Sequence, residues 1–303
     1  MLGALWLDAG LLGLLGLLVG SFLNVVIYRL PKMMENQWAA EIVQMTAEKA
    51  ADKVAANAVQ SPSDNTAPAK EATTDKPAFN LMVPRSRCQQ CGHQIRWFEN
   101  IPVASYLFLR GKCSSCGTKI SPRYPTVELV TGALFAWCGW KWGISSTALA
   151  WCAFSAAIVA LAMIDWDTTF LPDDITLPLL WGGLMAAALK LTSVPLPMAL
   201  WGVVAGYLSL WSIYWAFKLI TGKEGMGYGD FKLFAALGAW FGWPALIPMI
   251  LMASVIGAVV GIAMKFSSGL REGGYIPFGP FLAGAGLTAM FFGPQAIVAF
   301  IGL

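Results

Sequence analysis

The sequence predicts an all-α polytopic membrane protein with about eight transmembrane helices and a small cytoplasmic zinc module held by four cysteines. Three observations lead to this fold class. Hydrophobic residues make up 57% of the chain and charged residues 12%, whereas soluble domains average about 45–50% apolar and about 25% charged residues. Apolar runs recur that approach the roughly 20 residues needed to cross a bilayer. Two C-x-x-C pairs lie together in one polar stretch between these runs.

The apolar runs, taken in chain order, predict eight membrane segments. They lie near residues 5–28, 125–142, 146–164, 176–192, 198–219, 231–242, 244–265 and 277–301. The run at 231–242 is too short for a straight crossing, so we expect it to cross obliquely or to form a partial helix. The first run carries Asp8 and lacks the basic start of a signal peptide, which indicates a retained span.

Composition divides the chain into four parts. Residues 1–32 hold the first transmembrane helix, 33–83 a flexible cytoplasmic insertion, 84–124 a cytoplasmic zinc-binding module and 125–303 the transmembrane core. Inside the insertion, the helical spacing of alanine, glutamate and lysine favours a surface helix. A stretch rich in proline, serine and threonine at 60–80 reads as a flexible linker.

The positive charges predict the orientation in the membrane. Most lysines and arginines lie between residues 29 and 123, near 218–232, or near 265–271, and only Lys141 and Lys190 fall at the opposite turns. Short loops rich in these residues stay in the cytoplasm. We therefore expect residues 29–123 in the cytoplasm and the N-terminus outside.

The polar stretch contains a metal-ligand pattern, with two C-x-x-C pairs separated by 21 residues. The four sulfurs belong to Cys88, Cys91, Cys113 and Cys116. Four thiolates make a closed tetrahedral zinc site, which is the structural kind; free thiols or disulfides are the alternatives. His93, the only histidine, is not needed as a ligand, and Cys138 and Cys152 fit as small buried hydrophobic residues.

Acidic residues gather where two apolar runs meet the cytoplasmic side. Asp165 directly follows an apolar run, with Asp167 two residues further on, and Asp230 follows Gly227 and Gly229. Ionisable groups at membrane depth point to function by default. The two glycines leave room for a backbone or an extended substrate to pass the carboxylate. We expect Asp173 or Asp174 to cap the helix after Pro172.

Asp165 and Asp230 together predict an acid–base pair. Two carboxylates that share one proton supply one acid and one base, and such a pair hydrolyses a peptide bond without histidine or metal. On the physics alone, a structural carboxylate network and a proton or cation path through a transporter remain open, as does a scaffold without catalysis.

Five stretches resemble the type IV prepilin peptidases, the bifunctional leader peptidases and N-methyltransferases of bacterial pilus and type II secretion systems. These stretches are GSFLNVVIYRLP at 20–31, PRSRCQQCGHQIRWFENIPVASYLFLRGKC at 84–113, ISPRYPTVELVTG at 120–132, IDWDTTFLPDDITLP at 164–178 and GYGD at 227–230. The GxGD pattern also resembles that of presenilin-type membrane proteases.

The resemblance implies an aspartic endopeptidase that removes the short basic leader of prepilins and pseudopilins after a glycine. It implies methylation of the new N-terminal residue with S-adenosylmethionine. Asp165 and Asp230 would be catalytic, supported by Gly227, Gly229 and Asp167, and the four cysteines would bind zinc. The expected partners are these substrates and the lipid bilayer, and no nucleic acid. The expected location is the bacterial inner membrane, with a periplasmic N-terminus and a cytoplasmic active site.

The residues that would transfer a methyl group are not evident. The chain lacks the glycine fingerprint of a Rossmann nucleotide site. Glu99 and Glu128 are polar candidates near the cysteines, and Asn24 is another in the first span. For Glu128 a structural hydrogen bond is favoured over a methyl-transfer role, and for Asn24 packing is favoured over substrate contact. The S-adenosylmethionine site stays unassigned.

Overall fold

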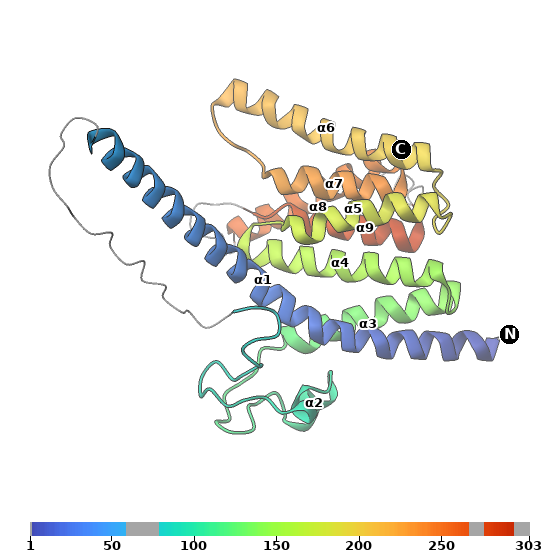
Figure 1. Cartoon of the computed structure of the whole chain (residues 1–303). Coiled ribbons are helices and arrows are strands. Elements are labelled where there is room, and N and C mark those ends of the chain that lie inside the picture. Colours follow the sequence, from blue (N-terminus) through green and yellow to red (C-terminus); the bar gives the residue numbers. More distant parts are fainter. Residues whose placement is uncertain (1, 59–78, 267–275, 294–303) are drawn as a thin grey trace.

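The computed structural model describes residues 2–58, 79–266 and 276–293, which form a helical bundle with a small module on its side (Figure 1). These residues contain no β-strand. The helices are α1 (Leu2–Ala58), η1 (Trp97–Asn100), α2 (Ala104–Phe108), α3 (Arg123–Trp142), α4 (Ser146–Thr168), α5 (Asp173–Ala188), α6 (Leu196–Thr221), α7 (Tyr228–Phe241), η2 (Trp243–Ala245), α8 (Leu246–Phe266) and α9 (Gly279–Phe292). The predicted all-α fold class is confirmed.

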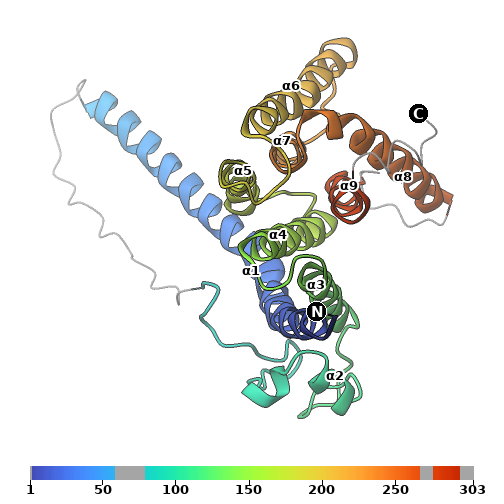
Figure 2. The same ribbon diagram turned by 90° about the vertical axis from the view of Figure 1, so that its right-hand side faces the viewer.

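Helix α4 lies at the centre of the bundle (Figure 2). Helices α1 and α3 pack together on one side of α4, and α5 and α9 pack separately on its other sides. Its inward face is fully buried at Phe154, Ile158, Leu161 and Ile164. Helix α7 packs against α5 and α6, and nearly all of its side chains are buried. Other helices surround the run at 231–242, which explains why a segment too short for a straight membrane crossing is so apolar.

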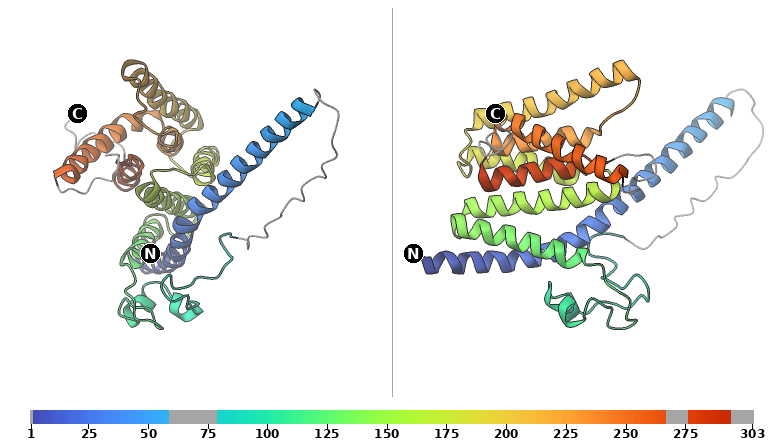
Figure 3. Two further views of the ribbon diagram at one scale, coloured as in Figure 1. Left: turned by 90° about the vertical axis from the view of Figure 1, so that its left-hand side faces the viewer. Right: turned by 180° about the vertical axis from the view of Figure 1, so that it is seen from behind.

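Helix α1 runs through the predicted boundary at residue 33 without ending. Its first part packs along α3, and the rest projects beyond the bundle (Figure 3). The helix contains Pro31, and proline bends a helix because it removes a backbone hydrogen bond. Residues 33–58 are thus helical, and most of the predicted linker at 60–80 lies outside the described residues.

Four helical stretches of the described residues are long and apolar enough to cross a membrane. They are Leu5–Ala50, Ser146–Thr168, Leu196–Thr221 and Trp243–Phe266. Helix α9 is apolar but shorter, and residues 294–303 of the predicted last span lie outside the described part. The count of eight spans stays a prediction.

The alternating directions of the helices bring several ends together. The C-terminal end of α4 meets the N-terminal ends of α5, α7 and α9 on the left of the bundle in Figure 1. The module at residues 79–122 leaves from the same side and returns to the start of α3. Both groups of sequence-predicted site residues therefore belong to one end of the molecule.

Candidate active site

Asp165 and Asp230 lie near one another at this end of the bundle. Asp165 is in the last turn of α4 and 4% exposed, and Asp230 is in the first turn of α7 and 8% exposed. Leu171 lies against Gly229, the residue before Asp230, and close to Gly279, whose N–H binds the Asp165 carboxylate, so the two acids belong to one site. The fold thus brings together two acids that are 65 residues apart in sequence.

The local sequence explains how each acid reaches this position. Helix α4 ends where Thr169 takes a left-handed conformation (φ 55°) and its N–H bonds to the Asp165 carbonyl oxygen, 2.8 Å away. Pro172 then precedes α5. Helix α7 begins after Gly227, which places the Asp230 carboxylate in the first turn, where the helix dipole favours negative charge.

The two glycines before Asp230 have different surroundings. A side chain on Gly229 would come within 2.7 Å of Cβ of Leu171, a buried residue of the α4–α5 connection. Gly229 therefore allows close packing of this connection on α7. Near Gly227 the nearest atom to an added Cβ would be Asp230 Oδ2 at 3.9 Å, an ordinary contact. A substrate path beside these glycines stays a prediction.

A third segment reaches the pair and was missed by sequence reasoning. The backbone N–H of Gly279, at the start of α9, donates a hydrogen bond to Asp165 Oδ2 over 3.0 Å. Gly279 lies 114 residues from Asp165 in sequence. A glycine followed by a proline is too common a pattern to have identified it.

Two further acids, one on either side of the α4–α5 connection, form ion pairs at the edge of the site. Asp167 pairs with Arg123 at the start of α3, with Oδ2 and Nη2 2.6 Å apart. Asp173 pairs with Lys232 of α7, with Oδ2 and Nζ 2.7 Å apart. The predicted capping by Asp173 or Asp174 is wrong, because Pro172 is the N-cap and no side chain caps α5. Both acids lie in the first turn, where they complement the helix dipole.

The four predicted cysteine ligands meet in the module, as expected. Their sulfur atoms all lie within 4.8 Å of one another, and the Cys88 and Cys116 sulfurs are 3.9 Å apart. Tetrahedral coordination with Zn–S bonds of about 2.3 Å places sulfurs about 3.8 Å apart, so the cluster fits a metal ion of this kind. Each pair sits in a tight turn closed by a glycine with positive φ, Gly92 (73°) and Gly117 (70°).

The four thiols differ in how readily they lose a proton. A hydrogen bond with the Thr118 side chain, which lies 3.2 Å from the Cys116 sulfur, lowers the pKa of the Cys116 thiol to about 6. Partial desolvation and the neighbouring sulfurs instead raise the pKa of the Cys91 thiol to about 11. The support for a metal therefore comes from the spacing of the four sulfurs.

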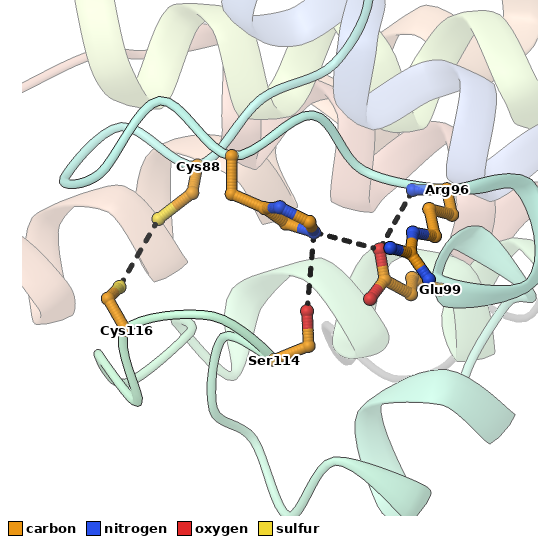
Figure 4. A network of polar contacts seen from close by, with 6 residues as sticks. Cys88, Arg96, Glu99, Ser114 and Cys116 are labelled. Atoms are coloured by element: carbon orange, nitrogen blue, oxygen red, sulfur yellow. Dashed lines mark hydrogen bonds and ion pairs between the residues drawn. The ribbon is translucent and has the colours of Figure 1, made fainter.

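His93 and Glu99 contact each other beside the four cysteines and are not part of the metal-ligand cluster. Figure 4 shows Glu99 apart from Cys88 and Cys116. The Arg96 backbone N–H donates to Glu99 over 2.8 Å and holds the pKa of that carboxyl below its usual value. The His93 ring lies 3.4 Å from both Glu99 and the Ser114 hydroxyl. In this structure Glu99 stabilises the fold of the module.

Glu128 connects α3 with the module, and Asn24 connects α1 with α3. Glu128 is 8% exposed in α3 and accepts a 2.8 Å hydrogen bond from the backbone N–H of Val103. Val103 has φ 59°, which is rare for a β-branched residue. The Asn24 amide donates to the Tyr124 carbonyl, 3.1 Å away, and joins α1 to α3. Both residues make the structural contacts that were favoured for them.

Arg29 is a second residue that sequence reasoning missed. It is 8% exposed, and its guanidinium donates to the backbone carbonyls of Asn80 at 2.9 Å and Pro84 at 2.6 Å. It thereby fixes the entry of the module against α1. In the sequence Arg29 is one basic residue among many, and nothing there indicated burial.

Comparison with known proteins covers most of the chain. Residues 14–142 match the model of the bacterial peptidase A24 N-terminal domain, and residues 152–262 match that of the type IV leader peptidase family. Relatives named prepilin leader peptidase/N-methyltransferase include proteins from Stutzerimonas stutzeri (49% identity over 95% of this chain and 91% of the relative), Pseudomonas aeruginosa (49%, 93% and 89%) and Aeromonas hydrophila (47%, 96% and 93%).

This chain belongs to the type IV leader peptidase family. The resemblance predicted from the sequence is thereby confirmed. No solved structure matches the chain. Together with the four apolar helices, the family indicates an inner-membrane protein.

The two family matches divide the candidate site residues of this leader peptidase family member. The cysteines and Glu128 lie within residues 14–142, and Asp165 and Asp230 lie within 152–262. Gly279 lies beyond both matched regions.

Proposed function

We propose that this protein cleaves the leader peptide of type IV prepilins and pseudopilins after a glycine and then N-methylates the new N-terminal residue. The relatives that share nearly half of its residues are named for both activities. The observation that carries the peptidase half is the burial of Asp165 and Asp230 at neighbouring helix ends on one side of the bundle. We propose these two residues as the catalytic pair.

The pair hydrolyses a peptide bond as one carboxylate and one carboxylic acid. The carboxylate takes a proton from a water molecule, and the water oxygen attacks the carbonyl carbon of the scissile bond. The carboxylic acid gives its proton to the carbonyl oxygen. When the tetrahedral intermediate collapses, the C–N bond breaks and the leaving nitrogen takes a proton from the pair.

The position of the pair supports cleavage at the membrane boundary. Both acids lie at helix ends, where water is easier to supply than at the bilayer midplane, and transporter acids lie near the midplane. We place this end at the cytoplasmic face and the N-terminus in the periplasm, because the basic residues favour that orientation. The apolar helix of a prepilin would then lie in the membrane with its basic leader in the cytoplasm.

We propose zinc as the metal of the cysteine module, in a structural role. Four sulfur ligands leave no open position for substrate, so the ion would organise the module and take no part in hydrolysis. S-adenosylmethionine is the proposed methyl donor.

The experiment is incubation of the purified protein with a prepilin, with and without S-adenosylmethionine, followed by mass measurement of the product. We expect leader loss in both reactions and one added methyl group only with the methyl donor. An intact prepilin would refute the peptidase, and a cleaved but unmethylated product would refute the transferase.

A further inference from the structure

We infer that the N-terminal end of α9 is a third part of the peptidase site, in which Gly279 is a positioning residue for the Asp165 carboxylate. The inference rests on the proposed function. It adds a segment that lies outside the regions matched to the family. The observations that support it are a hydrogen bond, the absence of a local cap on α9, and the absence of space for a side chain.

Helix α9 begins without a side-chain cap of its own. Its N-cap residue is Phe278, whose side chain has no hydrogen-bond acceptor, and Pro280 has no backbone N–H. The N–H of Gly279 instead donates to Asp165 Oδ2 over 3.0 Å, in a buried position. The first N–H groups of a helix need partners, and the helix dipole favours a carboxylate there. Asp165 of α4 therefore serves as the cap of α9.

A side chain at Gly279 would displace the Asp165 carboxylate. A Cβ at this position would lie 2.6 Å from Asp165 Oδ2 and 3.1 Å from its Cγ, so the carboxylate would have to move. Gly279 is not among the residues with positive φ, so its backbone conformation does not require glycine. The proximity of the carboxylate is therefore the reason that glycine suits this position.

Leu171 links the surroundings of the two aspartates. An added Cβ on Gly279 would lie 3.3 Å from Leu171 Cδ1, and one on Gly229 would lie 2.7 Å from Leu171 Cβ. The side chain is 4% exposed and thus fills the space between the starts of α7 and α9. The orientation of Asp165 relative to Asp230 consequently depends on α9 as well as on α4 and α7.

A shift of the Asp165 carboxylate should lower the rate of peptide-bond hydrolysis strongly and should change the affinity for the substrate little. Reacting groups must be held in a productive geometry, and a displacement of about 1 Å lowers rates by about 10²-fold. The Gly279→Ala variant should therefore show a kcat reduced about 10²-fold on a prepilin, with a KM within about threefold of the wild-type value. Unfolded protein would also lower the apparent kcat and leave KM unchanged, so kcat is calculated per folded molecule, with the folded fraction measured for each variant.

Gly284→Ala is the matched control. Gly284 lies in the same helix, is exposed, and has nothing within 4 Å of an added Cβ. The control should retain the wild-type kcat and KM. Thermal unfolding in detergent checks that both variants are folded, and methyl transfer to a pilin cleaved beforehand measures the second activity without requiring leader cleavage.

A second variant keeps the test decisive if Gly279→Ala does not fold. Replacing Gly279 by glycolic acid turns the amide into an ester, which removes the N–H donor without adding an atom. We expect kcat to fall about tenfold or more, because hydrogen bonds to charged groups are among the stronger ones.

Each result bears on one proposal. A wild-type kcat in the ester variant, or in folded Gly279→Ala, would overturn the role of Gly279. An equal loss in Gly284→Ala would overturn it too. Failure of the wild-type protein to cleave the prepilin would instead refute the proposed function.

Discussion

The two chemical centres of this protein differ in how they are held together. The aspartate pair lies among fully buried side chains, including Ile164 beside Asp165 and Phe231 beside Asp230. The cysteine module contains no buried residue in η1 or α2, and two of its four clustered cysteines are exposed. Helix packing positions the first centre, whereas the second has little apolar core in the described residues.

This difference indicates two sources of stability. Burying apolar side chains stabilises the bundle with or without a ligand. A small module without a core needs a metal or a disulfide to fold. We therefore expect removal of the metal to affect the module strongly and the bundle hardly at all.

Metal removal should produce the largest difference between the two regions. Structural zinc binding contributes about 10–16 kcal/mol of apparent folding free energy in small modules. Chelation, or Cys88→Ser, should expose the backbone of the module to rapid hydrogen exchange while α4 and α7 stay protected. Cys138→Ser, which changes a buried thiol in α3, is the control for thiol loss. A module that stays protected without metal would contradict the comparison.

Removing the link between the two regions should have an intermediate effect. Glu128 joins α3 to the module through the Val103 N–H. Glu128→Ala leaves that donor without its partner, which costs about 1–3 kcal/mol. We expect faster hydrogen exchange in η1 and α2, with kcat for leader cleavage unchanged within about threefold.

The control for this prediction is Glu41→Ala on the exposed part of α1. It should leave hydrogen exchange in the module unchanged. A large loss of cleavage in Glu128→Ala would show that the two centres are coupled more tightly than their separate packing suggests.

The ion pair between Lys232 and Asp173 should have the smallest effect. Its side chains are 29% and 49% exposed, and exposed ion pairs contribute about 0–1 kcal/mol. Lys232→Ala should lower cleavage at most severalfold, and the swap Lys232→Asp/Asp173→Lys should restore most of it. Asp174→Ala, a change in the same helical turn, should retain much of the activity. A swap that restores nothing would mean that Lys232 acts on the substrate directly.

The sequence predicted the parts of the fold and site that depend on composition and spacing. Long apolar runs indicated membrane helices, the C-x-x-C spacing brought together Cys88, Cys91, Cys113 and Cys116, and boundary placement singled out Asp165 and Asp230. Each apolar run and each C-x-x-C pair is a local signal, whereas the pairing of Asp165 with Asp230 was inferred from the similar placement of two acids that are 65 residues apart.

The remaining features depend on contacts between distant segments. Gly279 acts through its own backbone N–H, and Arg29 binds backbone carbonyls of another segment. Backbone groups are the same in every residue type except proline, so the sequence did not indicate these contacts. The cap of α5 was assigned to an aspartate on propensity, but Pro172 holds that position and Asp173 pairs with Lys232 instead. The continuation of α1 through Pro31 was missed because proline and a change in composition suggest a boundary.

The central claim is that Asp165 and Asp230 act as one catalytic pair, and cleavage by the two asparagine variants tests it most directly. Asp165→Asn and Asp230→Asn preserve size and remove the acid, so each should lower prepilin cleavage by about 10³-fold or more, since a missing acid or base alone costs about 10²–10⁴-fold. Both variants should still methylate a pilin cleaved beforehand. Wild-type cleavage by either variant, in membranes that contain equal amounts of protein, would contradict the account.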